Sequence, residues 1–387
     1  MWRNITSNVL TFLVVAVFLL GGVILWGQNE YSAAGPLDEQ ICLRVERGAS
    51  MRGISSKLAA ENAVTNSSIF RIGTEYANKN NQLKAGSWLI PQRASMAEIT
   101  DLITRGGAST CGTEVVYRVG VTRSLIEVRE LDPATNRFVE KAKFNPAEDE
   151  APAEFTDVRE RSDTRYRVAI AEGVTSWQII EGLKAIDVLE GELAEVPPEG
   201  SLAPDSYEVA SGDARADVVQ KMRNAQDAYL AAAWENRADG IPLENPYEAL
   251  ILASIIEKET GVSTERGQVA SVFTNRLEQG MRLQTDPTVI YGITEGVGIL
   301  GRGIRQSELR AATPYNTYVI DGLPPTPIAN PGRASIEAAV NPLETDYVFF
   351  VAKTLDPRDG HLFAETLQEH NENVAAYRRL EAEQANQ

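Results

Sequence analysis

Two carboxylates at the end of an aliphatic run are the residues best suited to catalysis in this sequence. Residues 250–261 read LILASIIEKETG, in which Glu257 and Glu259 follow a stretch of apolar side chains. A carboxyl removed from water has a raised pKa and can donate a proton near neutral pH. Helical periodicity puts the two acids on different faces and does not choose between them. The alternative is that both emerge at a solvated helix end and pair with Arg266 or Arg276.

Polar motifs downstream of this run suit a groove for sugars. They are NRL (275–277), LQTDPTVIYG (283–292), TPYNTY (313–318) and GLPPTPIANPG (322–332). Amide and hydroxyl side chains can both donate and accept hydrogen bonds, as sugar hydroxyl and acetamido groups require. Each residue could instead be a turn former or a buried polar group satisfied within the core. The candidate substrate-binding residues are Asn275, Gln284, Asp286, Tyr291, Asn316 and Tyr318.

Helices and one strand must position these residues. Asn245 can cap a helix that Pro246 opens and Gly261 ends. A second helix is expected over 264–280, a strand over 346–353, and a polar helix from about residue 365.

The N-terminus carries the compartment signal. Val9 to Trp26 contains no charged residue and is long enough to cross a bilayer. Arg3 precedes it and Glu30 is the first charge after it, which predicts a cytoplasmic N-terminus and an extracytoplasmic remainder. A cleaved signal peptide is the alternative. Outside the cytoplasm Cys42 and Cys111 can form a disulfide, which we expect, although two free thiols are not excluded by sequence.

Composition narrows the function classes. The net charge of −17 argues against a nucleic-acid binder. Only two histidines are present, without a cysteine cluster, so we expect no metal site and no cofactor.

The predicted fold class is α+β. A strand–helix–strand–helix layout at 42–107 returns about 125 residues later, with Gly48 and Gly173 in matching places. A hairpin is expected at 124–144 and an acidic exposed loop after it. The predicted division is a cytoplasmic segment 1–8, an anchor 9–27, a linker 28–41, a first α/β subdomain 42–112, a hairpin-and-loop insertion 113–166, a second repeat unit 167–243 and a catalytic domain 244–387.

The chain resembles the membrane-anchored endolytic murein transglycosylases (the MltG, or YceG-like, family) in the order and spacing of five motifs. They are LASIIEKETG, VASVFTNRL, LQTDPTVIYG, TPYNTY and GLPPTPIANPG. HLFAETLQEHN at 361–371 is similar to that family's closing motif, and 42–107 and the second repeat are similar to LysM-like units. The resemblance implies cleavage of the MurNAc-β-1,4-GlcNAc bond by one acid that later acts as base, with attack by the sugar's C6 hydroxyl giving 1,6-anhydroMurNAc ends. It assigns the acid to Glu257 and groove roles to Gln284, Asp286, Asn316 and Tyr318. Glu259, Glu265 and His361 are secondary candidates for catalytic residues, and each could equally have only a structural role.

Two other functions remain open at this point. A non-catalytic peptidoglycan-binding scaffold would use the LysM-like units alone, and a lysozyme-type hydrolase would need a second catalytic carboxylate. The expected location is the bacterial inner membrane, and the expected partners are peptidoglycan strands and penicillin-binding synthases that extend them.

Overall fold

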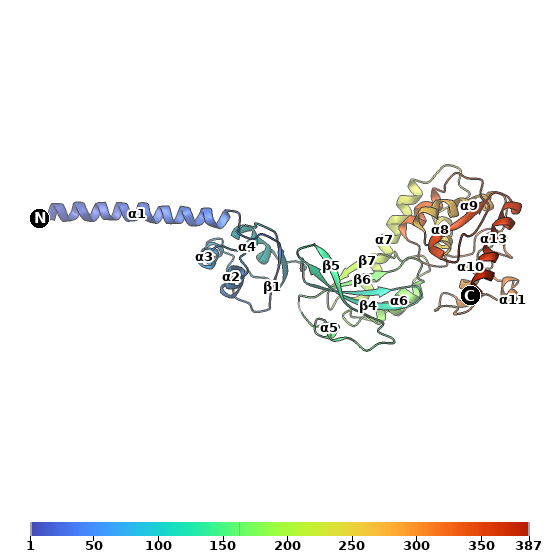
Figure 1. Cartoon of the computed structure of the whole chain (residues 1–387), viewed down its shortest axis with the longest axis horizontal. Coiled ribbons are helices and arrows are strands. Elements are labelled where there is room, and N and C mark those ends of the chain that lie inside the picture. Colours follow the sequence, from blue (N-terminus) through green and yellow to red (C-terminus); the bar gives the residue numbers. More distant parts are fainter. Residues whose placement is uncertain (1, 162, 386–387) are drawn as a thin grey trace. The chain divides into compact units, whose positions relative to one another are not determined.

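The chain folds as a mixture of helices and strands, as the α+β prediction requires (Figure 1). This computed structural model describes residues 2–161 and 163–385. Its residues form two compact units, 1–116 with 127–144 and 149–166, and 117–126 with 145–148 and 167–387.

The N-terminal helix α1 (Trp2–Ser32) is long, apolar and exposed. The span Val9–Ser32 contains an 18-residue window with a mean hydropathy of 2.8, and no residue of that window is buried in the protein. Among the described residues this is the one helix that could cross a membrane by length and composition.

A small block follows, with the element order β1 (Ile41–Val45), α2 (Met51–Ala60), α3 (Ser67–Tyr76), β2 (Gly86–Ile90) and α4 (Met96–Arg105). Strands β1 and β2 pair antiparallel, with Leu43 opposite Trp88. The predicted helical stripes form the core, since Ile54, Leu58, Ile99 and Ile103 are all buried. Side-chain caps start each helix, as the sequence pattern of Ser and Asn favours.

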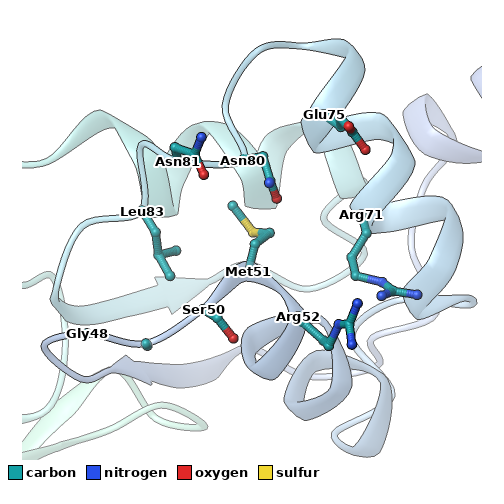
Figure 2. A pocket seen from close by; sticks show the side chains of 10 residues that line it. Gly48, Ser50, Met51, Arg52, Arg71, Glu75, Asn80, Asn81 and Leu83 are labelled. Atoms are coloured by element: carbon teal, nitrogen blue, oxygen red, sulfur yellow. The ribbon is translucent and has the colours of Figure 1, made fainter.

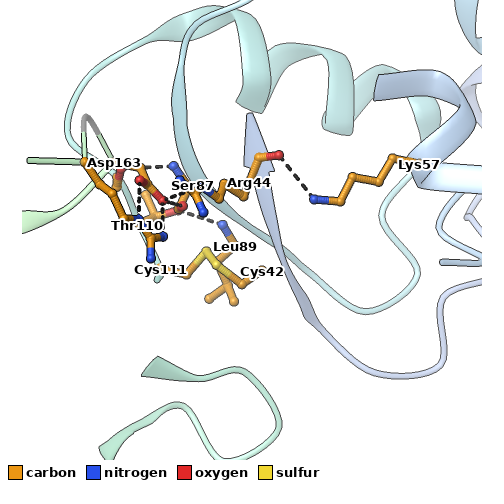
Figure 3. The surroundings of a disulfide bond; sticks show 10 residues. Cys42, Arg44, Lys57, Ser87, Leu89, Thr110, Cys111 and Asp163 are labelled. Atoms are coloured by element: carbon orange, nitrogen blue, oxygen red, sulfur yellow. Dashed lines mark hydrogen bonds and ion pairs between the residues drawn. A yellow bond between two sulfur atoms is a disulfide. The ribbon is translucent and has the colours of Figure 1, made fainter. Parts of the chain in front are cut away.

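The predicted disulfide between Cys42 and Cys111 is formed (Figure 3). It joins strand β1 to the segment before strand β3 (Thr113–Val119), with the two Cα atoms 5.8 Å apart. Beside it the buried Asp163 carboxylate accepts a hydrogen bond from Ser87 Oγ (2.9 Å) and pairs with Arg44 (3.2 Å). A covalent and an ionic link therefore fasten β1 and β2 to the chain that follows.

One five-stranded sheet has the strand order β5–β4–β3–β6–β7. Its strands are β3 (Thr113–Val119), β4 (Ser124–Asp132), β5 (Arg137–Phe144), β6 (Arg165–Ile170) and β7 (Ser206–Val209). The predicted hairpin corresponds to β4 and β5, joined at a turn where Asn136 has a positive φ of 53°. The expected boundary at 166–167 passes through β6, so the hairpin and the second repeat share a sheet. The short helix α5 (Ala153–Thr156) lies in the predicted acidic loop.

The second repeat has the predicted order β6, α6 (Ser176–Lys184), β7, α7 (Arg215–Glu235). Gly48 and Gly173 have φ angles of 79° and 77°, a region that favours glycine, and each precedes a capped helix. The paired positions in the two copies are buried alike: Val45, Ile54 and Leu58 in the first, and Ile170, Ile179 and Leu183 in the second.

The C-terminal elements surround one apolar core. They are α8 (Pro246–Glu259), η1 (Ser263–Glu265), α9 (Arg266–Glu278), α10 (Asp286–Thr294), α11 (Gln306–Leu309), α12 (Arg333–Val340), β8 (Phe349–Ala352), η2 (Pro357–Asp359), β9 (His361–Ala364) and α13 (Leu367–Ala385). Helix α8 is buried on every side from Ala249 to Ile256 and packs on α9 and α12. Strands β8 and β9 pair antiparallel. Helices α10, α11 and α12 were not predicted, because they lie in or beside a Pro- and Gly-rich stretch, and strand β9 was not predicted because it has only 4 residues.

Candidate functional site

The last turn of helix α8 carries three charged side chains, Glu257, Lys258 and Glu259. Asn245 caps the start of the helix by accepting a hydrogen bond from Glu248 N (3.1 Å), as predicted. Because the body of the helix is fully buried, its last turn is fixed by packing. In that turn Glu257, Lys258 and Glu259 are each partly buried. The alternative considered from sequence, in which both acids emerge at a solvated helix end, is therefore wrong.

Glu257 binds the start of helix α12. Its Oε2 accepts hydrogen bonds from Gly332 N (3.0 Å) and Ser335 Oγ (2.7 Å), and its Oε1 lies 3.8 Å from the Arg266 guanidinium. Glu172 also pairs with Arg266 (3.2 Å) and lies so close to Gly332 that a Cβ there would overlap it. Burial and the nearby Glu257 charge raise the pKa of Glu172. Both oxygens of Glu257 are thus engaged by donors or a cation, and its side chain is 6% exposed.

Glu259 lies in a different environment. Its Oε1 accepts a hydrogen bond from Thr285 Oγ1. Burial raises the pKa of Glu259 and the neighbouring Asp286 charge raises it further, against opposing effects of the Thr285 bond, His361 and Arg276. A carboxyl in such surroundings retains its proton to higher pH than a solvated one.

Three of the predicted groove residues gather beside Glu259. Tyr318 OH donates to Asp286 Oδ1 (2.7 Å), and burial together with this bond raises the pKa of the Tyr318 phenol. Gln284 precedes Thr285 in the chain and has a positive φ of 49°, held by its N–H bond to Thr317 O (3.1 Å). Thr285, which binds Glu259, is the chain neighbour of both Gln284 and Asp286, so this stretch lies on the side of Glu259.

The other three predicted groove residues have contacts that support the fold. Asn275 donates to the carbonyls of Thr345 (2.7 Å) and Tyr347 (2.8 Å). Asn316 is fully buried and its amide donates to three carbonyls in the chain between 308 and 311. Tyr291 OH donates to Glu199 (3.3 Å). These contacts match the polar, fold-supporting alternative that the sequence left open, and a groove role for the three residues stays a prediction.

A buried amide connects the second repeat to this region. Asn330 Nδ2 donates to Val174 O (3.1 Å) and Glu199 Oε1 (3.1 Å), and its Oδ1 accepts from Leu202 N (2.9 Å). Lys258 Nζ adds a bond to Gly173 O (3.2 Å). The turn that opens helix α6 is thereby held against the end of helix α8.

Glu265 and His361, two secondary candidates, form a bidentate pair. Glu265 Oε1 accepts from His361 N (2.9 Å), and Glu265 Oε2 lies 2.9 Å from His361 Nδ1. The side chains are 14% and 15% exposed. The other histidine, His370, stacks on Phe349 with ring centroids 5.0 Å apart.

Four residues in this region were not singled out from sequence: Glu172, Glu199, Thr285 and Asn330. Thr285 lies between Gln284 and Asp286, which were both singled out, so the motif itself indicated this position. Glu172 and Glu199 lie in a repeat whose sequence gave no indication of contact with the end of α8. Within residues 2–161 and 163–385 no three His, Cys, Asp or Glu side chains are grouped as metal ligands.

A separate cavity of about 560 Å³ lies in the first small block (Figure 2). Figure 2 shows Met51 and Leu83 near its middle and the amides of Asn80 and Asn81 above them. Arg52, Arg71 and Glu75 bring charged groups to the other side. The mixture of apolar and hydrogen-bonding groups suits a sugar, and glycan binding by this block stays a prediction.

Comparison with known proteins gives a consistent result. A model of the YceG-like family matches residues 43–376. The endolytic murein transglycosylase of Bacillus subtilis is 27% identical over 93% of this chain and 91% of its own. That of Streptococcus pneumoniae is 26% identical over 97% of this chain, which spans 66% of the longer pneumococcal protein. A crystal structure of a YceG-like protein from Listeria monocytogenes aligns with 86% of this chain and 98% of its own, at 25% identity and a TM-score of 0.45.

Proposed function

The chain belongs to the YceG-like family, and we propose on that premise that it is an endolytic murein transglycosylase whose substrate is the peptidoglycan glycan strand. The reaction is cleavage of the β-1,4 bond between MurNAc and GlcNAc within a strand. One observation carries the chemistry: a desolvated carboxyl, Glu259, is fixed at the end of a fully buried helix beside Asp286 and Tyr318.

Glu259 is the better proton donor of the two acids. A general acid must hold a proton near neutral pH and have room for the leaving oxygen. Burial and Asp286 favour the protonated form of Glu259. Glu257, expected from the resemblance, already accepts bonds from Gly332 and Ser335 and faces Arg266, so it is less free to reach a substrate.

The proposed step needs one acid from the protein. Glu259 gives its proton to the glycosidic oxygen as the C1–O4 bond breaks, and the C6 hydroxyl of the same MurNAc attacks C1. This attack is intramolecular, so its entropic cost is already met within the substrate. The hydroxyl loses its proton to a base, and the product ends in a 1,6-anhydro ring. We assign Asp286, Tyr318 and Gln284 to orienting the sugars on either side of this bond.

The N-terminal helix supports a further proposal on location. Helix α1 is long and apolar enough to anchor the chain in the bacterial inner membrane, with the catalytic region outside the cytoplasm. An anchored enzyme reaches glycan close to the membrane, where penicillin-binding synthases extend new strands. We therefore propose that it trims or terminates nascent strands.

Product analysis tests the function. The detergent-solubilised full chain is incubated with purified peptidoglycan, and the fragments are identified by mass spectrometry. Internal fragments with 1,6-anhydroMurNAc ends are expected. Reducing ends would indicate a lysozyme-type hydrolase, and intact strands would indicate a non-catalytic binding protein.

A further inference from the structure

We propose that the cavity in the first small block binds the peptide stems of peptidoglycan, the short acidic peptides that are attached to MurNAc. The inference rests on the proposed function, because these stems are part of its substrate. It follows from a comparison of the two repeats. The second repeat holds an extended segment of the chain itself between two loops, and the counterparts of these loops in the first block line the cavity.

In the second repeat the place between the two loops is filled by a segment around Asn330. The loop between β6 and α6 pairs with its main chain, since Gly173 N donates to Asn330 O (3.0 Å) and Asn330 N donates to Val174 O (2.9 Å). Asn330 precedes Pro331, which favours an extended conformation. In the loop before β7, Leu202 N donates to Asn330 Oδ1 (2.9 Å). Asn330 has no exposed surface, so the chain occupies this place in the manner of a bound peptide.

In the first block the matching place is an open cavity (Figure 2). Its lining includes Gly48 and Ala49 from the loop between β1 and α2, and Asn80 from the loop before β2. Gly48 is exposed, whereas its counterpart Gly173 is buried. In the part of the chain that the structure describes, Gly48 N and Ala49 O make no hydrogen bond, although their counterparts both bind Asn330. Two main-chain groups are therefore available to a ligand.

The pattern of these bonds fits a peptide better than a sugar. Asn330 uses the N–H of one peptide group and the C=O of the next, which point to the same side of an extended residue. An acetamido group has a single amide, and its N–H and C=O point in opposite directions because the amide is trans. Such a group does not reproduce both main-chain bonds of Asn330. Main-chain pairing is instead a recurring way of recognising an extended peptide.

The charged side chains of the cavity favour an acidic peptide. In the second repeat Glu199 accepts a hydrogen bond from the Asn330 amide (3.1 Å), which suits a neutral donor. The lining of the first cavity has two guanidinium groups, those of Arg52 and Arg71, against one carboxylate, Glu75 (Figure 2). Among the described residues Arg71 Nε is buried without a hydrogen-bond partner. Guanidinium groups bind carboxylates through paired, charge-assisted hydrogen bonds, and the stems carry free carboxylates.

Isothermal titration calorimetry on the detergent-solubilised full chain tests the inference. The probe is the free stem, a tetrapeptide released from purified peptidoglycan by an amidase and carrying no sugar. Arg52→Gln together with Arg71→Gln should raise the Kd of the stem by about tenfold or more, because bonds between cations and its carboxylates are lost. A synthetic stem with N-methylated peptide groups should also bind more weakly than the unmodified stem, because it has no N–H to donate to Ala49 O.

Arg47→Gln together with Arg105→Gln is the matched control. Both arginines are exposed in the same block, and neither lines the cavity. The control variant has the same net charge as the cavity variant, and it should bind the stem as tightly as the wild type does.

Three outcomes would overturn the inference. They are a stem that the wild type does not bind or that the cavity variant binds equally well, an N-methylated stem that binds as tightly as the unmodified one, and a GlcNAc tetramer that binds more tightly than the stem and is weakened by the cavity substitutions. The last outcome would make the cavity a sugar site. Because calorimetry does not use the reaction, the two proposals fail separately: a chain that forms no anhydro ends would refute the transglycosylase function, whatever its affinity for the stem.

Discussion

Glu257 and Glu259, two residues apart in the last turn of helix α8, contact parts of the chain that are distant from one another in sequence. Glu257 binds Gly332 and Ser335 at the start of helix α12. Glu259 binds Thr285, next to Asp286, at the start of helix α10. The two acids therefore have different surroundings and should respond differently to substitution.

Replacing each acid with its amide separates their roles. Glu259→Gln should lower the rate of anhydro-end formation by roughly 10²- to 10⁴-fold, because the amide has no proton to donate. Glu257→Gln should lower it far less, since an amide can still accept from Gly332 N and Ser335 Oγ. Rates on purified peptidoglycan give the comparison. The reverse order of the two losses would return the catalytic role to Glu257.

The stability of the protein should depend on pH through Glu259. Its pKa is raised in the folded state, so between the ordinary glutamate pKa of about 4.3 and that raised value the native state binds more protons than the unfolded chain. The free energy of unfolding therefore falls as pH rises through this window. Glu259→Gln should reduce the fall, leaving the part that Glu172 contributes, and should be more stable than the wild type at pH 8. Urea unfolding at pH 5 and pH 8 measures this, and a variant less stable than the wild type at pH 8 would contradict it.

The disulfide should stabilise the first unit without affecting catalysis. It closes a loop with a sequence separation of 69. Removing a bridge of this size costs about 4 kcal/mol in the chain-entropy description. The double substitution Cys42→Ser with Cys111→Ser should therefore make residues around 41–105 sensitive to limited proteolysis, with the rate on small glycan fragments retained. Mass spectrometry without reductant verifies the bond in the wild type; an equally resistant variant would show that the bridge contributes little.

Asn330 should be important for the stability of the second unit. Asn330→Ala leaves the buried Leu202 N–H without its acceptor and removes the bond to Glu199. We expect the free energy of unfolding to fall by about 2 to 3 kcal/mol, the cost of an unsatisfied buried group together with a lost bond. Asn224→Ala, at an exposed position of helix α7, is the matched control and should change stability little. Urea denaturation of both variants measures the two changes in the free energy of unfolding, and an equal, small change in both would contradict the prediction.

The anchor should determine which strands are cut. Replacing residues 1–27 with a cleavable secretion signal should release the enzyme from the membrane and change the length distribution of glycan strands in the cell. Chromatography of the isolated strands measures the lengths. An unchanged distribution would argue that attachment to the membrane does not select the substrate.

Several features followed from sequence because neighbouring residues decide them. Asn245, Pro246 and Glu248 determined where helix α8 begins, and an uninterrupted aliphatic run determined that it is buried. The apolar stretch from Val9 to Trp26 was sufficient to predict helix α1. The disulfide followed from a pair of cysteines placed outside the cytoplasm, and the repeat from matching glycines before two capped helices.

The identities of the site residues depended on contacts between distant parts of the chain. At 3.6 residues per turn Glu257 and Glu259 face different directions, but the sequence of α8 does not say which elements lie in each. Thr285 reaches Glu259 across 26 residues, and His361 reaches Glu265 across 96. Asn275 and Asn316, polar candidates for the groove, donate hydrogen bonds to backbone carbonyls of distant or looped segments, which the sequence did not indicate. The sequence by itself determined that a buried helix ends in two acids. Only the tertiary structure decided that Glu257 binds the start of helix α12 and that Glu259 binds Thr285 next to Asp286, because the partners and the charge around a side chain are set by whatever the fold packs around it.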